Sequence, residues 1–342
     1  MIEPQSRDNI LAEWRNRALA FELEVEKAII GQARAIRLLT ISIFARGHVL
    51  LEGDVGVGKT TLLRAASRAI GGEFNRVEGT VDMMPGDLLY NAYVAPDGTP
   101  RVEPGPLARN GEQLAVFFFN EVSRARPQVQ ALLLRAMAER SVTAFHREVR
   151  LPHLTVFADR NRVEKEETFE LATAARDRFM FEIGMAVPTD PAIRRALVFD
   201  PAFHDADALI ERVASNVVPY QDLNGVAALI QREVRASDAL QDYVLQLWTA
   251  TQKPLDYGIR VEGTGDDLVL AGASPRGMSQ LLRAARVAAW LDGRTFLVPE
   301  DVQGVFHESV AHRVFFNPVV ELRRAEVARE FTHQVLQKVA AP

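Results

Sequence analysis

The chain has 342 residues, of which 48% are hydrophobic and 25% are charged, and its formal net charge at pH 7 is −5. This balance is typical of a soluble globular protein and excludes a disordered or fibrous chain, while the length suits two domains. The absence of cysteine excludes disulfides and thiolate metal sites. Because no apolar run is long enough for a membrane span and the start lacks the regions of a signal peptide, we expect a cytoplasmic protein. No basic patch is evident, so nucleic acid is not an expected partner.

The first part of the chain is predicted to be a helix followed by a parallel α/β sheet. An amphipathic helix is expected over Arg7–Ala28 and ends before Gly31-Gln32, where the glycine breaks the pattern. Between Gly47 and Pro188, short apolar runs alternate with helical stretches, which favours a parallel sheet. The predicted strands are His48–Glu52, Val77–Thr80, Val116–Glu121, Leu154–Ala158 and Met180–Met185, and the predicted helices are Lys59–Ile70 and Pro127–Arg140.

After Pro188 the pattern changes to helices alone. The expected division is therefore residues 1–190 for the N-terminal helix and the α/β domain, 191–204 for a linker that holds Pro191 and Pro201, and 205–342 for a helical domain. The predicted helices of this part are Asp207–Ser215, Leu223–Arg235, Ser237–Thr251, Ser274–Leu291, Pro299–Arg313 and Val320–Val339.

A phosphate-binding loop is predicted between the first strand and the helix that follows it. Its residues are Gly53-Asp54-Val55-Gly56-Val57-Gly58-Lys59-Thr60, with Thr61 next. Glycines let the backbone N–H groups curl around phosphates, Lys59 reaches the terminal phosphates, and the Thr60 hydroxyl is suited to Mg²⁺. An ordinary glycine-rich turn is the alternative, but the strand before and the helix after favour a site for ATP and Mg²⁺.

The strand Val116–Glu121 has the pattern of a Walker-B strand, an apolar run that ends in polar groups. An aspartate normally supports the magnesium shell at its end, and the glutamate that follows orients the attacking water. Here the aspartate is replaced by Asn120, which can still accept a hydrogen bond from a magnesium-bound water but carries no charge. Glu121 is retained. We therefore expect nucleotide binding with slow hydrolysis.

With these motifs, the chain resembles the MoxR family of AAA+ ATPases, in the helix-2-insert group, over roughly its whole length. The resemblance rests on the turn Pro104-Gly105-Pro106-Leu107, the strand end Asn120-Glu121-Val122-Ser123-Arg124-Ala125, and the helix Gln130–Arg140 with its leucine-leucine-x-x-methionine-x-glutamate pattern. It implies a P-loop AAA+ domain with a parallel sheet, followed by an all-helical C-terminal lid.

The resemblance also implies further site residues. Asn161 stands at the sensor-1 position, Arg178 in Asp177-Arg178-Phe179 at the position of an arginine finger, and Arg276 in Ser274-Pro275-Arg276-Gly277 at sensor 2, while Gly31 and Gln32 resemble the pair beside the adenine. Taken alone, each residue has a structural alternative: a turn asparagine, a surface salt bridge, a helix cap or a helix break. Arg176 is a weaker finger candidate.

Two segments resemble the insertions of this group, and several positions depart from its pattern. Leu88–Val102 and Val142–Leu151 are predicted to be hairpins. Besides Asn120, Ser123 stands where asparagine is usual, and Asp159-Arg160-Asn161-Arg162 replaces threonine-glutamine-asparagine-proline. Binding is expected to survive these changes better than turnover.

The resemblance implies a chaperone-like ATPase that works as a homo-oligomer, with a hexameric ring expected because an arginine finger acts across a subunit boundary. It also implies a von Willebrand factor A domain protein as partner and a client enzyme complex, through dehydrogenase assembly or metal insertion. The alternative is a nucleotide-gated switch or scaffold with little hydrolysis, suggested by Asn120. A DNA-acting ATPase is disfavoured by the lack of a basic stripe.

Overall fold

The computed structural model describes residues 4–161 and 169–342, so Arg162 lies outside the described residues. The chain divides into two compact units. The sheet unit comprises residues 16–178 and 183–224, and the lid unit comprises residues 1–15, 179–182 and 225–342. A compact unit is not the same thing as a domain that folds by itself, so the expected division into 1–190, 191–204 and 205–342 stays a prediction.

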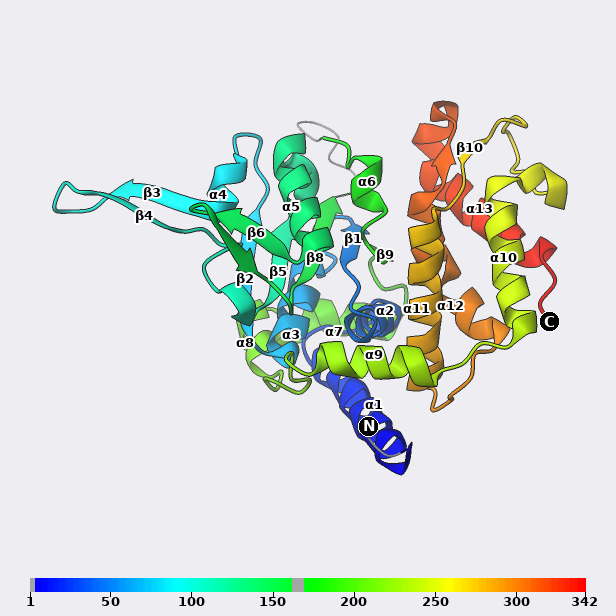
Figure 1. The fold of residues 1–342 in the computed structure, drawn as a ribbon, viewed down its shortest axis with the longest axis horizontal. Helices are drawn as coiled ribbons and strands as arrows, with labels where there is room; N and C mark the ends of the chain where they lie inside the picture. Colours follow the sequence, from blue (N-terminus) through cyan, green and yellow to red (C-terminus); the bar gives the residue numbers. More distant parts are fainter. Residues whose placement is uncertain (1–3, 162–168) are drawn as a thin grey trace. The chain divides into compact units, whose positions relative to one another are not determined.

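A five-stranded sheet forms the core of the sheet unit, in the order β2-β5-β8-β1-β9 (Figure 1). The pairs β2–β5, β5–β8 and β8–β1 are parallel. Every residue of β5 is buried, as a continuous apolar run requires in a sheet covered on both faces. The strands are β1 (Val49–Gly53), β2 (Glu73–Glu78), β5 (Leu114–Asn120), β8 (Thr155–Asn161) and β9 (Phe181–Met185).

Helices follow the strands, as the alternating pattern predicts. The helix α3 begins at Lys59, directly after the glycine-rich loop, and ends at Ile70 before Gly71, whose φ is +71°. The other helices up to residue 211 are α1 (Pro4–Glu26), α2 (Ala33–Phe44), α4 (Pro85–Leu89), α5 (Pro127–Glu139), α6 (Thr173–Arg176), α7 (Pro191–Phe199) and α8 (Ala206–Glu211).

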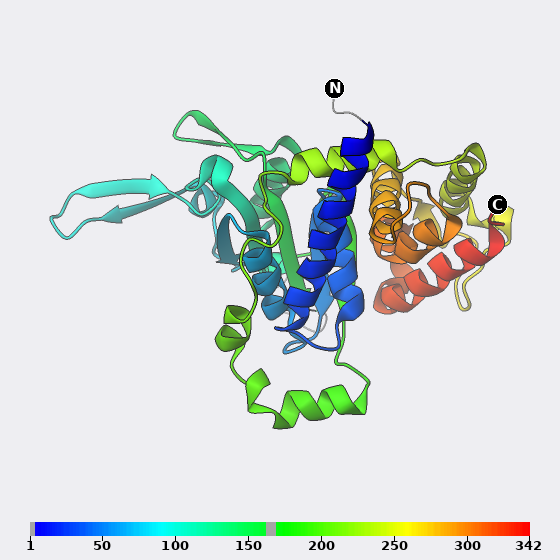
Figure 2. The same ribbon diagram turned by 90° about the horizontal axis from the view of Figure 1, so that it is seen from below.

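Both expected hairpins are present. Strands β3 (Tyr90–Val94) and β4 (Pro100–Pro104) pair antiparallel, as do β6 (Ser141–Ala144) and β7 (Arg147–Arg150). Every residue of β3 and β4 is exposed, and the hairpin extends away from the sheet in both views (Figures 1 and 2).

The lid unit is built from packed helices, as expected, with one addition. Two short strands, β10 (Val269–Ala271) and β11 (Phe315–Phe316), form an antiparallel pair that the helical pattern did not predict. The helices are α9 (Leu223–Glu233), α10 (Asp238–Gln252), α11 (Pro275–Leu291), α12 (Pro299–Val310) and α13 (Arg324–Lys338). Short 3₁₀ turns along the chain lie at Gly111–Gln113, Val122–Arg124, Pro201–Phe203, Pro254–Tyr257, Ala311–Arg313 and Pro318–Arg323.

Two segments differ from their predicted form. Strand β2 covers Glu73–Glu78 rather than Val77–Thr80, because it is an edge strand with few buried side chains and lacks an apolar run. The proline-containing stretch expected to be a linker holds the helix α7, which has no buried residue and appears as the green helix standing off the sheet in Figure 2. Within the described ranges, no helix has the length and apolarity needed to cross a membrane.

Candidate nucleotide site

The glycine-rich loop has the backbone geometry that phosphate binding requires. Gly56 and Gly58 have φ values of +82° and +91°, which side-chain-bearing residues rarely adopt. A Cβ on Gly58 would also lie 2.6 Å from Ile29 Cδ1, so the loop packs closely against the segment before Gly31. The helix α3 starts immediately after Gly58, and no side chain caps its N-terminus. Its first N–H groups are therefore directed at the loop, where an anion is favoured.

Lys59 is buried, with 7% of its surface exposed, and its ammonium group is held by three acceptors. Nζ donates to the carbonyl oxygens of Gly53 at 2.7 Å and Asp54 at 3.1 Å. It also donates to Oδ1 of Asn161 at 2.7 Å. A lysine ammonium has three donors, so all of them are engaged. Contact with a phosphate therefore requires Lys59 to release at least one of these acceptors.

Asn161 connects Lys59 to Glu121. While its Oδ1 accepts from Lys59, its Nδ2 donates to Oε1 of Glu121 at 3.3 Å. The other carboxylate oxygen of Glu121 accepts from Arg124 at 3.1 Å. Sequence reasoning selected Lys59, Asn161 and Glu121 but missed Arg124. The sequence feature that could have identified Arg124 is its position three residues after Glu121, because side chains at this spacing on a helical turn lie close together.

The end of the Walker-B strand is held by a neighbouring carboxylate. Glu121 has φ +52°, a left-handed conformation, and its N–H donates to Oδ1 of Asp159 at 2.6 Å. Asp159 is 2% exposed, and burial raises its pKa above the usual range, while the hydrogen bond from Glu121 and the charge of Lys59 act in the opposite direction. Asn120 is also buried, and its carbonyl oxygen accepts from Gly79 N–H at 2.8 Å. Sequence reasoning recorded Asp159 only as a departure from the family pattern.

These residues fit a nucleotide with Mg²⁺. The loop N–H groups and Lys59 suit phosphates, and hydroxyl, amide and carboxylate oxygens from Thr60, Asn120 and Asp159 are of the kind that Mg²⁺ prefers. In the part of the chain that the structure describes, no group of three or more His, Cys, Asp or Glu residues is placed to hold a metal ion. A magnesium ion here would accordingly share its ligands with the phosphates.

The segment expected beside the adenine lies against the same loop. Gly31 has φ +76°, and a Cβ there would lie 2.7 Å from Pro188 Cγ. Gln32 is buried, with 9% of its surface exposed, and its Nε2 donates to the carbonyl oxygen of Ala186 at 2.8 Å. Since Ile29 contacts Gly58, these residues lie near the phosphate loop. Their contact with an adenine stays a prediction.

The two candidate finger arginines differ in their partners. Arg176 is 8% exposed and pairs with Glu170 at 3.3 Å. Arg178 donates from Nη1 to the carbonyl oxygen of Ala174 at 2.8 Å, and within the described residues it forms no ion pair with a carboxylate. The salt-bridge alternative therefore describes Arg176, whereas no carboxylate of the described residues pairs with the guanidinium of Arg178.

Arg276 lies in the lid unit, at the start of α11. Ser274 caps this helix, and its hydroxyl accepts from Gly277 N–H at 3.0 Å. Pro275 occupies the first helical position, and Arg276 is exposed. The helix start is as the sequence predicts, and the role of Arg276 toward the phosphates stays a prediction.

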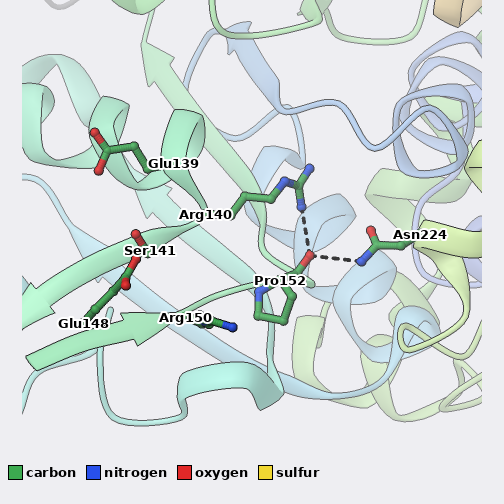
Figure 3. A pocket seen from close by; sticks show the side chains of 7 residues that line it. All are labelled: Glu139, Arg140, Ser141, Glu148, Arg150, Pro152 and Asn224. Carbon is green, nitrogen blue, oxygen red and sulfur yellow. Dashed lines mark hydrogen bonds between the residues drawn. The ribbon is translucent and has the colours of Figure 1, made fainter.

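A separate hollow of about 440 Å³ lies at the base of the β6–β7 hairpin (Figure 3). Arg140 and Asn224 both donate to the carbonyl oxygen of Pro152, at 3.2 and 3.1 Å. The lining residues are Glu139, Arg140, Ser141, Glu148, Arg150, Pro152 and Asn224, none of which is a predicted site residue. The two donors fix the end of the hairpin and add no group to the nucleotide site.

Comparison with known families agrees with this geometry. Residues 48–181 match the ATPase family associated with various cellular activities (AAA), and residues 266–338 match an AAA lid domain. A crystal structure from Cytophaga hutchinsonii superposes with a TM-score of 0.83 at 28% identity, covering 99% of this chain and 98% of that one. The fold and the phosphate loop thus define an AAA+ ATPase, a class that binds nucleotide with Mg²⁺ and is typically oligomeric.

Sequence relatives identify the family within that class. The chain is 60% identical to Protein MoxR of Methylorubrum extorquens, over 98% of each chain. It is 54% identical to Protein MoxR of Paracoccus denitrificans, over 93% of this chain and 94% of that one. Identity to Chaperone MoxR1 of Mycobacterium tuberculosis is 31%, over 93% and 81% respectively. The chain belongs to the MoxR family of AAA+ ATPases.

Proposed function

We propose that this chain binds Mg-ATP at the loop Gly53–Thr60 and hydrolyses it slowly. The observation that carries the proposal is the linkage of Lys59 to Glu121 through Asn161. Bound Mg²⁺ would supply positive charge against the charge that develops on the phosphates. Lys59 would leave Asn161 for the terminal phosphates, and Glu121, released from the amide of Asn161, would orient the attacking water. The proposed nucleotide residues are Gly31, Gln32, Gly53, Asp54, Val55, Gly56, Val57, Gly58, Lys59, Thr60 and Thr61, with Thr60 and Asn120 toward Mg²⁺.

Substitution of Lys59 tests the nucleotide site. We expect Lys59→Ala to abolish ATP binding measured by equilibrium titration, with folding checked by circular dichroism. Lys27→Ala is the matched control, because Lys27 is exposed and pairs with Glu24, on the surface of α1, at 2.6 Å. Unchanged ATP affinity in a folded Lys59→Ala protein would refute the assignment. Steady-state turnover of the parent chain then separates an ATPase from a nucleotide-gated switch, the alternative that Asn120 favours.

The proposed active unit is a ring, with hexamer as the expected size. Arg178 would supply its guanidinium to the phosphates bound by the neighbouring subunit, which is consistent with its lack of a carboxylate partner among the described residues. Mixing Arg178→Ala subunits with Glu121→Gln subunits should restore activity that neither variant has alone. Mixtures that co-assemble and stay inactive would remove Arg178 from this role.

The proposed task is remodelling of a partner protein. A relative named as a chaperone supports this class of activity. A von Willebrand factor A domain protein and a client enzyme complex, served by assembly or metal insertion in the cytoplasm, are the partners that we propose from the family. Glu121→Gln should stall the complex, because the glutamine cannot activate water. Mass spectrometry of proteins that co-purify with this variant, but not with Lys59→Ala, would identify the client.

A further inference from the structure

The charge missing from Asn120 has a close substitute on the adjacent strand. Strands β5 and β8 are parallel and in register, with Phe119 opposite Ala158, so the next pair along both strands is Asn120 and Asp159. Residues paired in this way project to the same face of a sheet, with strands about 4.8 Å apart. Asn161, two residues after Asp159, shares that face and reaches Lys59 and Glu121. Asp159 therefore lies between the Walker-B position and the sensor-1 asparagine.

Asp159 is a buried carboxyl group with one hydrogen-bond donor, and the charges of Lys59 and Arg76 act on it from a distance. Burying a carboxylate costs several kcal/mol unless a cation or several donors compensate it. Asp159 receives one hydrogen bond, from Glu121 N–H to Oδ1, and among the residues that the structure describes no donor bonds to Oδ2. Lys59 acts on Asp159 only through its charge, because its own donors are engaged elsewhere.

A purely structural role does not require this charge. A neutral side-chain oxygen could also accept the Glu121 N–H, in a weaker hydrogen bond but without the cost of burying a carboxylate. Arg76, whose charge also acts on Asp159, is itself paired with Glu78. A charged acceptor is therefore explained when a metal cation binds at this strand end, beside the phosphates expected at Lys59.

We propose that Asp159 is a positioning residue for Mg²⁺, supplying from β8 the carboxylate that Asn120 does not supply from β5. Its Oδ2 would accept a hydrogen bond from a magnesium-bound water, and its Oδ1 would keep the Glu121 backbone in place. This rests on the proposed nucleotide site. The other carboxylate flanking Asn120 is Glu78, opposite it on β2, but its side chain is 60% exposed and pairs with Arg76 at 3.6 Å.

The test measures how much Mg²⁺ strengthens nucleotide binding. The affinity of the full chain for a fluorescent ATP analogue is measured by titration with excess Mg²⁺ and again with EDTA. The readout is the dissociation constant in EDTA divided by that in Mg²⁺. Asp159→Asn preserves the acceptor for Glu121 N–H and removes only the charge. We expect it to reduce the Mg²⁺-dependent ratio by about tenfold, the lower range for loss of an outer-shell partner. Its affinity in EDTA and its thermal midpoint should not fall.

Two further variants make the result specific. Asn120→Asp combined with Asp159→Asn returns the carboxylate to β5 and should restore the ratio. Glu78→Gln, at the carboxyl end of the neighbouring strand β2, should leave the ratio unchanged. If Asp159→Asn retains the parent ratio, or if Glu78→Gln is the variant that loses it, Asp159 does not hold the magnesium shell. A drop in the thermal midpoint without a change in the ratio would likewise overturn the proposal in favour of a structural role. Absence of nucleotide binding by the parent chain would instead refute the proposed function, and this proposal with it.

Discussion

Asn161→Asp should strengthen the resting contact of Lys59 and thereby weaken nucleotide binding. In the present structure Lys59 donates to a neutral amide oxygen of Asn161 at 2.7 Å. Because the donor is an ammonium, this bond already contributes about 1.5–3 kcal/mol. A carboxylate acceptor turns it into a part-buried ion pair, whose Coulomb attraction, less the cost of desolvating the carboxylate, adds about 1–2 kcal/mol to the state in which Lys59 is held. Because Lys59 must leave this acceptor to reach a phosphate, ATP affinity should fall by about 5- to 30-fold.

The assay is equilibrium titration of ATP and ADP, with Asn161→Ala as the comparison. Removing the acceptor frees Lys59, so Asn161→Ala should bind nucleotide at least as tightly as the parent. It should nevertheless turn over more slowly, because alanine lacks the amide expected at the sensor-1 position. Simple repulsion between the new carboxylate and the nucleotide would weaken ATP more than ADP and would diminish with salt. If Asn161→Asp bound both nucleotides with the affinity of the parent, the contact between Lys59 and residue 161 would not compete with phosphate binding.

Three further outcomes follow from the structure. Asp301→Ala should lower the free energy of unfolding in urea by about 2–3 kcal/mol, because it breaks a buried pair in which Arg294 donates to both carboxylate oxygens at 2.5 and 2.6 Å; a loss below about 0.5 kcal/mol would contradict this. Burial holds the pKa of His153 below its ordinary 6.5, so its stabilising contribution is present above that pH and is lost as the pH falls further. His153→Phe should therefore flatten the acid side of the stability profile, by up to about 1.4 kcal/mol per pH unit, and an unchanged slope would assign the acid loss to other groups. Gly79→Ala should destabilise the chain and abolish turnover, since its Cβ would lie 2.3 Å from the carbonyl oxygen of Glu121; a variant with parent-like turnover would show that the strand end can shift without harm.

The parts of the fold that the sequence predicts well are those with strong local signals. Strand β5 was expected from its phenylalanine run and is buried throughout, and α3 was expected from the loop that opens it. The edge strand β2 has no such run, so only part of it was predicted. The prolines around residues 191–201 were interpreted as a linker. Within this stretch Pro191 starts a helix that was not predicted, after Asp190 accepts the N–H of Ala192 at 2.8 Å, because proline is compatible with a first helical turn.

The candidate site divides in the same way. The contiguous loop Gly53–Thr60 is evident from spacing alone. Asn161 was selected only through family resemblance, and its contact with Lys59, 102 residues away in sequence, was not predicted. Arg124 was missed because a short 3₁₀ turn, which has no apolar pattern, brings its guanidinium to Glu121.

Asn120 illustrates why a motif read one position at a time misjudges chemistry. The sequence registers the loss of a carboxylate at the end of β5, and from that loss alone slow hydrolysis follows. Glu121 and Asp159 are 38 residues apart, yet parallel pairing places their strand ends together. An ion responds to the charge within a few ångströms, whichever strand carries it. The relevant quantity is therefore the total charge at the carboxyl ends of the strands rather than the residue at one motif position. By that measure, the carboxylate that we propose for Asp159 offsets the substitution at Asn120.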